Sequence, residues 1–275
     1  MTATAPAVHN PAQHASKVRL TPGGILRSEW IKLRSLRSTV WSYAVLLVIQ
    51  IAIGLLITSV AVSRGSGTEA GRLLEAPGFA ALGATAGVNF GQLVVSVLGV
   101  LVISGEYSTG QIRSTFAAVP KRLPVLWAKA AVFGVVTFAV SLVAILLTYL
   151  VTWPILSGAG VTSNLFDSDV YLKLLGGAGY LALIGLLALA LGAVLRNTAG
   201  GIAAALGLLL VVPVIFGLIP ADWAHSVSDW LPGNAGASLF QSGGVFEWWQ
   251  GLLILLGWIT VVGAAAAVLM KRRDA

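Results

Sequence analysis

The chain has 275 residues, of which 57% are hydrophobic and only 10% are charged. A soluble globular domain carries about 25% charged residues, so this composition excludes an ordinary soluble protein and indicates an integral membrane protein. The formal net charge of +7 would suit nucleic-acid binding, but the basic residues lie at the ends of apolar runs, which favours membrane topology and no nucleic-acid partner.

The chain is predicted to have two parts. Residues 1–24 are rich in Ala, Pro and Thr and have no apolar core of the kind a secretory signal needs, so we expect a disordered cytoplasmic tail. Residues 25–275 are predicted to form a single transmembrane domain.

The stretch from residue 23 to 39 mixes apolar and basic residues at helical spacing. The apolar positions are Leu26, Trp30, Leu33 and Leu36. This pattern predicts an interfacial elbow helix lying among the lipid headgroups. The alternative is that these residues are simply the positively charged flank of the first span.

Six apolar segments are long enough to cross about 30 Å of hydrocarbon, which takes roughly 20 helical residues. They cover residues 40–62, 79–104, 125–153, 172–195, 198–219 and 248–270. The second begins either at Phe79 or nearer to Val88, because the sequence between them is small and polar. The fold class is therefore an all-α integral membrane protein with six transmembrane helices.

The Lys and Arg residues predict the orientation, since cytoplasmic loops carry the excess. Fourteen of the 17 fall on one side of the six spans, and only Arg64, Arg72 and Lys173 fall on the other. Both termini are thus expected on the cytoplasmic side of the membrane. In the last outer loop, ADWAHSVSDWLPGN predicts either a short helix stopped by Pro232 and Gly233 or a solvated loop with aromatic anchors.

Charged residues are almost absent from the interiors of the spans, which disfavours an ion-coupled secondary transporter. Lys129, near the start of the third span, is expected to snorkel to the interface. Small residues form pairs four positions apart, Gly87 with Gly91 and Ala188 with Gly192. Such pairs indicate helix packing or dimerisation.

A few uncharged polar residues interrupt the first, second and fifth spans. Asn89, Gln92 and Ser96 share one face of the second span, and Gln50 lies in the first. They predict either hydrogen bonds between helices or a substrate path. Pro213 is expected to kink the fifth span, either as a gate or as a packing feature.

Known enzyme and metal signatures are missing from the sequence. It has no HExxH, GxSxG or Walker A motif and no cysteine, and its three histidines are scattered. We expect no metal site and no cofactor bound by this chain. If the protein works with ATP, the ATPase must be another polypeptide.

The most informative segment joins the second and third spans and reads GEYSTGQIRSTFAAVPKRLPVLWAK. It resembles the corresponding loop of ABC-2 type transporter permeases, G-E-[FY]-x-x-G-T-I-R followed by P-x-R and a Lys that opens the next span. The matching residues are Gly105, Glu106, Tyr107, Gly110, Ile112, Arg113, Pro120, Arg122 and Lys129, whereas Gln111 replaces the usual Thr. Three further segments resemble the family: SEWIKLRSLRST its elbow, LRNTAGGIAAAL its turn into the fifth span, and WLPGNAG its last outer loop.

This resemblance implies a permease subunit that pairs with a second permease, identical or not, and with two cytosolic ATPase subunits that use ATP and Mg. It implies a coupling helix around residues 108–119. The residues assigned to coupling are Glu106, Tyr107, Gly110, Ile112, Arg113 and Pro120. If the helix continued through the loop, Glu106 and Arg113 would share one face and join an ion-pair network; the alternative is that both are ordinary charges at a membrane edge.

The expected function is ATP-driven transport, in the export direction that the resemblance implies, of a hydrophobic or amphipathic small molecule or peptide. A different class of function fits the same loop: a sensor or scaffold that docks a cytosolic partner without transporting anything. A membrane enzyme is a third class, but the sequence offers no catalytic constellation for it.

Overall fold

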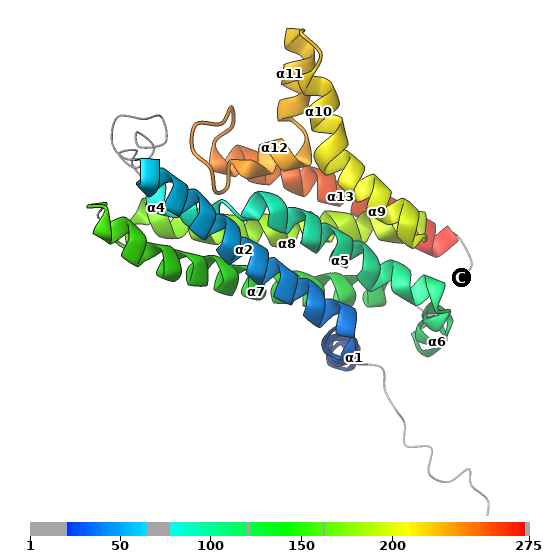
Figure 1. The fold of residues 1–275 in the computed structure, drawn as a ribbon. Helices are drawn as coiled ribbons and strands as arrows, with labels where there is room; N and C mark the ends of the chain where they lie inside the picture. Colours follow the sequence, from blue (N-terminus) through cyan, green and yellow to red (C-terminus); the bar gives the residue numbers. More distant parts are fainter. Residues whose placement is uncertain (1–20, 65–77, 120–121, 162, 273–275) are drawn as a thin grey trace, which may run out of the picture.

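The computed structural model describes residues 21–64, 78–119, 122–161 and 163–272, and all regular elements in these ranges are helical (Figure 1). Six helical segments are long and apolar enough to cross a membrane. They are Arg37–Arg64, Phe79–Ser108, Leu123–Gly158, Ser168–Leu195, Thr198–Gly217 and Trp248–Arg272. An all-helical, multi-pass architecture is thereby confirmed, and the expected N-terminal tail lies outside the described residues.

The helices of the described residues form one series along the chain. Their order is α1 (Pro22–Ser35), α2 (Arg37–Arg64), α4 (Phe79–Thr85), α5 (Val88–Ser108), α6 (Gln111–Ala118), α7 (Leu123–Gly158), α8 (Ser168–Leu195), α9 (Thr198–Leu206), the π-helical η2 (Gly207–Val211), α10 (Val212–Gly217), α11 (Asp222–Asp229), α12 (Pro232–Ala237) and α13 (Trp248–Arg272). Helices α1 and α6 and the end of α13 lie at one end of the bundle, and α4 lies at the other (Figure 1).

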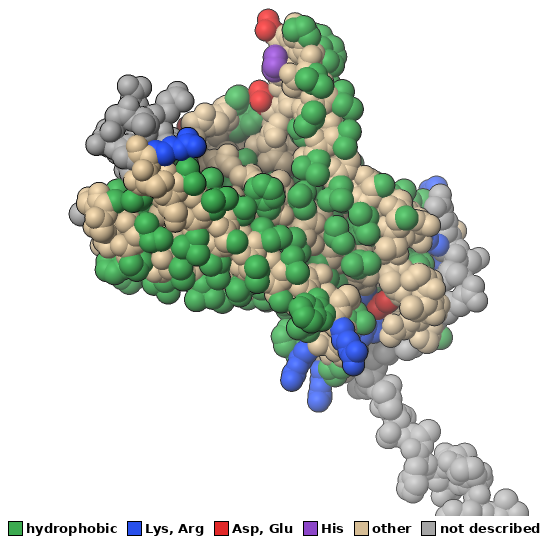
Figure 2. Space-filling model, in the orientation of Figure 1, with side chains coloured by type: hydrophobic (Ala, Val, Ile, Leu, Met, Phe, Trp, Pro, Cys, Tyr) green, Lys and Arg blue, Asp and Glu red, His purple; other side chains and the backbone are tan. Residues whose placement is uncertain are grey.

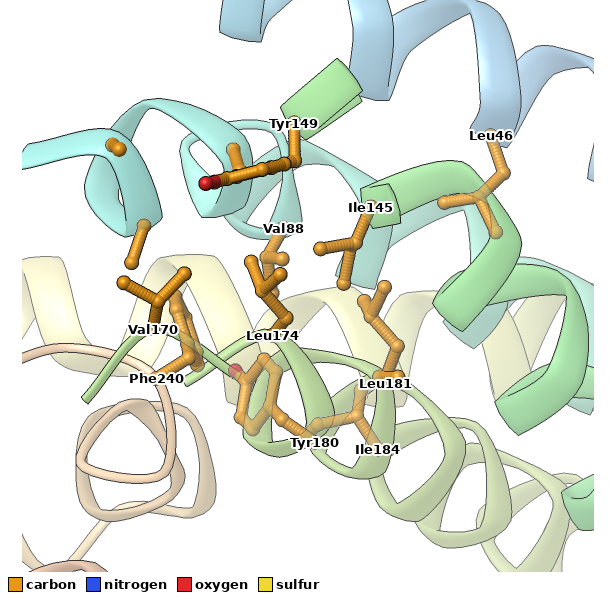
Figure 3. Close-up of a cluster of buried hydrophobic side chains, with 14 of the residues drawn as sticks. Leu46, Val88, Ile145, Tyr149, Val170, Leu174, Tyr180, Leu181, Ile184 and Phe240 are labelled. Carbon is orange, nitrogen blue, oxygen red and sulfur yellow. The ribbon is translucent and has the colours of Figure 1, made fainter. Parts of the chain in front are cut away.

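Helices α5 and α8 form the centre of the bundle. They are the most buried of the six spans and pack against each other along their length. Glycine permits this approach, because a Cβ built on Gly99 would lie 2.4 Å from the carbonyl oxygen of Gly185. Figure 3 shows part of the buried core, in which Val88 of α5 and Leu181 of α8 lie near Ile145 of α7.

The predicted small-residue pairs serve packing within the chain. A Cβ on Gly87 would lie 2.6 Å from Cα of Gln50 in α2, and one on Gly91 would lie 2.8 Å from Leu46 Cδ1. Ala188 and Gly192 lie on α8, where both are buried. Close packing of helices therefore accounts for both pairs.

The second span is divided, as the small and polar start of that segment suggested. Helix α4 ends at Thr85, and α5 begins at Val88 after Ala86 and Gly87. Six of the seven residues of α4 are buried, so this short helix is part of the core.

Of two predicted helix ends beside a proline, one is wrong and one is confirmed. The third span was predicted to end at residue 153, but α7 continues through Pro154 to Gly158, and burial of Leu156 in the core holds the last turn despite the lost hydrogen bond. The short helix predicted in the last outer loop is present as α11, which ends at Asp229, before Pro232. Pro232 then opens α12, as proline favours the first helical turn. Helix α12 then packs against α13 and α8.

The fifth span departs from regular α-helix at the predicted proline. The π-helical turn of η2 precedes Pro213, and the Val212 N–H donates to the carbonyl of Gly207, five residues back. Pro213 cannot donate to Leu209, four residues back, so the irregularity falls where a regular helix would lose its hydrogen bond. Helix α9 packs against α5 and α8, whereas α10 protrudes from the bundle with α11 in Figure 1, and this span is among the least buried.

Charged side chains are distributed unevenly over the molecule. In Figure 2, Lys and Arg side chains gather at the end that bears α1 and α6, whereas acidic and histidine side chains lie over the protruding α10–α11 region. This asymmetry agrees with the one counted along the sequence.

Candidate functional site

Four charged side chains from three helices meet at the α1–α6 end of the bundle. Glu29 and Lys32 lie on α1, Glu106 on α5 and Lys129 on α7. Lys32 Nζ lies 2.8 Å from Glu29 Oε1 and 2.9 Å from Glu106 Oε1. Lys129 Nζ lies 2.9 Å from the same Glu106 oxygen and also bonds Glu29 Oε2. The two lysines and two glutamates thus form a closed ring of ion pairs, which we call the charge ring.

The charge ring is buried. Glu29 and Lys129 are each 3% exposed and Glu106 is 6% exposed, whereas Lys32 lies at the margin. Buried charges are tolerated when they are paired and hydrogen-bonded, and here two positive and two negative groups balance. The snorkelling predicted for Lys129 is therefore wrong: its ammonium points to carboxylates of α1 and α5 rather than to water.

Lys32 also connects the charge ring to the short helix α6. Its Nζ lies 3.3 Å from the Thr115 hydroxyl oxygen. Desolvation lowers the pKa of Lys32, but hydrogen bonds and charges from Glu29 and Glu106 outweigh it and hold the pKa above the ordinary value of 10.5. Lys32 is therefore positively charged at neutral pH.

Local sequence explains why α1 presents these side chains. Thr21 caps the helix by accepting a hydrogen bond from the Gly24 N–H at 3.2 Å, and Pro22 opens the first turn. The helix ends at Ser35. Because Glu29 and Leu33 are four residues apart, they share the buried face that packs on α7.

Helix α6 is separated from α5 by two residues, Thr109 and Gly110. Gly110 has a φ of +72°, a left-handed conformation that other residues rarely adopt. Ile112 anchors α6, since it is 3% exposed and belongs to the same apolar cluster as Leu33. The opposite side of α6, with Gln111 and Ser114, is exposed.

The structure separates some of the predicted coupling residues. Because α5 ends before Gly110, Glu106 and Arg113 lie on different helices, and the condition for a shared helical face is not met. The described partners of Glu106 are Lys32 and Lys129. The side chain of Arg113, and Pro120 altogether, lie outside the described residues.

Tyr107 belongs to a second group of contacts at the same end. The guanidinium carbon of Arg196 lies 5.2 Å from the centre of the Tyr107 ring, and Arg196 Nη2 donates to the Leu269 carbonyl at 3.1 Å. Arg122 Nη1 donates to the Met270 carbonyl at 3.2 Å. Arginines thus satisfy carbonyls in the last turn of α13 and tie it to neighbouring helices.

Most of the polar residues proposed for a substrate path make hydrogen bonds inside the bundle. Gln50 Nε2 donates to the Ala84 carbonyl at 2.7 Å, and the Gln92 side-chain oxygen accepts from the Tyr180 hydroxyl. Ser96 is fully buried and bonds the Gln92 carbonyl. Of the set, Asn89 is exposed, and Pro213 lies on the fifth span away from these contacts.

Sequence reasoning missed Glu29 and Lys32 as members of the site. The available signal was a Glu and a Lys three residues apart on a helix otherwise rich in basic residues. Within the described ranges, no group of His, Cys, Asp and Glu side chains is arranged to hold a metal ion.

A scan against models of known protein families found no match, and a search of curated proteins found no significant relative. The charge ring and the exposed helix α6 therefore carry the functional argument, together with the resemblance of the central loop.

Proposed function

We propose that this chain is the membrane-spanning permease subunit of an ABC-2 type transporter, working with a cytosolic ATPase and a second permease copy. Its termini and helix α6 face the cytoplasm of a bacterial cell. The transporter exports a hydrophobic or amphipathic small molecule or peptide, and ATP and Mg are used by the partner subunit.

The observation that carries this proposal is the attachment of α6 to three longer helices. The charge ring joins α1, α5 and α7, and Lys32 and Ile112 attach α6 to it. A force applied to the exposed side of α6 would be passed to the ends of two spans at once. A flexible loop would not transmit such a force.

The test is to purify the chain from its native membranes, identify the proteins that accompany it and measure their ATP hydrolysis. Ser114→Trp adds bulk to the exposed side of α6, and Ser226→Trp adds the same bulk to exposed α11 as a matched control. We expect a P-loop ATPase to co-purify with the wild type and the control, and to be lost from Ser114→Trp.

Glu106→Gln distinguishes binding of the ATPase to this chain from the coupling of ATP hydrolysis to transport. It keeps the shape of the side chain while removing its charge, so the ATPase should still bind but no longer respond to substrate. Absence of any ATPase under conditions that preserve the oligomer would refute the transporter. A bound partner without ATP-linked movement of solute would instead indicate a sensor or scaffold.

A further inference from the structure

A groove lies at the end of the bundle opposite the charge ring. It encloses about 600 Å³ between α2, the α4–α5 junction and the segment after α12. Its apolar wall includes Ile53, Ile57 and Phe90, and the side chains of Ile57 and Phe90 are exposed. At 1.5 Å per residue, Ile57 and Ile53 lie about 10 and 16 Å from the end of α2 at Arg64. The groove therefore extends from the end of the bundle along α2, one of the helices long and apolar enough to cross a membrane.

A cation stands at the mouth of this groove. Lys173 lies five residues into α8, near the end of the span, and its Nζ would lie 3.1 Å from a Cβ on Gly78. In the described part of the chain it forms no ion pair or hydrogen bond, and Asp169 one turn earlier does not reach it. Asn89 and Gln241 line the same mouth.

This combination suits one kind of molecule. A half-buried ammonium without a described counter-ion favours an anion, and nearby amides can donate hydrogen bonds to its oxygens. The adjoining wall is apolar and open toward the lipid phase. An anion attached to a hydrocarbon chain satisfies both parts of the groove at once.

We propose that this groove binds an anionic phospholipid, with its phosphate against Lys173 and one acyl chain along Ile53, Ile57 and Phe90. The proposal does not rest on ATP-driven transport. It holds or fails by lipid binding alone, so its failure would leave the proposed permease function untouched.

The absence of cysteine allows a direct measurement. Gly244→Cys, close to the groove-lining Ser242, has open space around its Cβ and can carry a single fluorophore. The full chain is placed in phosphatidylcholine vesicles, and quenching is titrated with chain-spin-labelled phosphatidylglycerol or phosphatidylcholine. We expect phosphatidylglycerol to half-quench at a mole fraction lower by roughly fivefold, the effect of one lysine near a membrane surface.

Matched variants test whether Lys173 causes the preference for phosphatidylglycerol. Lys173→Gln should abolish the preference for phosphatidylglycerol while leaving quenching by phosphatidylcholine unchanged, which also reports that the variant is folded. Asp169→Asn, one helical turn away, and Lys271→Gln, at the opposite end of the bundle, should keep it. Ala86→Trp, which fills the groove, should weaken quenching by both lipids.

Equal quenching by the two lipids in the wild type would overturn the proposal. A preference for phosphatidylglycerol that survives Lys173→Gln would also overturn the proposal. So would a preference that Lys271→Gln reduces as much as Lys173→Gln does. Either result would show that the preference comes from the general charge of the protein surface.

Discussion

At the scale of single residues, the charge ring is the feature that sequence reasoning reached only in part. Glu106 was assigned to coupling, whereas Lys129 was expected to snorkel and was matched only as the lysine that opens the third span. Its partners lie 23 and 100 positions away in the sequence, on α5 and α1. No local pattern reports such a pairing, so the burial of Lys129 becomes visible only when three helices are placed together.

Breaking the charge ring should destabilise the protein more than removing a matched pair. Lys129→Met leaves two buried carboxylates facing one lysine, and we expect a loss of about 3–5 kcal/mol in the free energy of unfolding. The double variant Glu29→Gln, Lys129→Met removes one charge of each sign and should recover part of the loss. Denaturant unfolding in detergent measures both. If the losses of unfolding free energy in the single variants Glu29→Gln and Lys129→Met simply add up in the double variant, the result would argue against the charge ring.

The pKa of Lys32 leads to a prediction at alkaline pH. Because this pKa is raised in the folded protein, the stability that Lys32 contributes is fully present below 10.5 and is lost as the pH rises through the folded value. The difference in melting temperature between the wild type and Lys32→Gln should therefore be constant near neutral pH and shrink above 10.5. A difference that keeps its neutral-pH size as the pH rises well above 10.5 would contradict this account.

At the scale of helices, hydropathy predicted the six spans but tertiary packing determined their ends. The runs of apolar residues in α2 and α13 are visible in the sequence alone. Pro154 is retained inside α7 because Leu156 is buried, and sequence gives no measure of that burial. The contact of Gly99 with Gly185 was likewise missed, since the two glycines come from different spans and form no local motif.

Two glycines of α5 should respond oppositely to substitution. Gly99→Ala puts a methyl group 2.4 Å from the Gly185 carbonyl oxygen and 3.2 Å from the Leu189 nitrogen, so α5 and α8 must separate. We expect a loss of about 1–3 kcal/mol. Gly105→Ala meets nothing within 4 Å and should be neutral or stabilising, because alanine favours helix. Thermal unfolding in one detergent compares them, and equal effects would refute the tight contact.

At the scale of the whole molecule, the basic residues predict which end faces the cytoplasm. The two candidate sites lie at opposite ends of the bundle, the charge ring beside α6 and the groove beside α4. Composition and charge counting anticipated the multi-pass architecture. They did not anticipate that the last part of the fifth span, α10, protrudes from the bundle, because the π-helical turn before it and the low burial of this span depend on how the helices pack.

Single cysteines in this cysteine-free chain test the orientation. A membrane-impermeant maleimide should label Gly244→Cys in intact cells but should label Ser114→Cys, on α6, only after the membrane is opened. The expected asymmetry follows from the excess of Lys and Arg on the α6 side. Labelling in the reverse order would invert the topology and move the proposed ATPase contact to the wrong side.

The balance of charge within the ring has an electrical consequence. Moving one elementary charge across a membrane potential of 100 mV is worth about 2.3 kcal/mol. Two lysines and two glutamates sum to zero, so displacing the ring as a unit along the membrane normal does no net work against the potential. A conformational change that carries the ring should therefore be indifferent to voltage, whereas in Lys129→Met the same movement would carry one negative charge and become voltage-dependent.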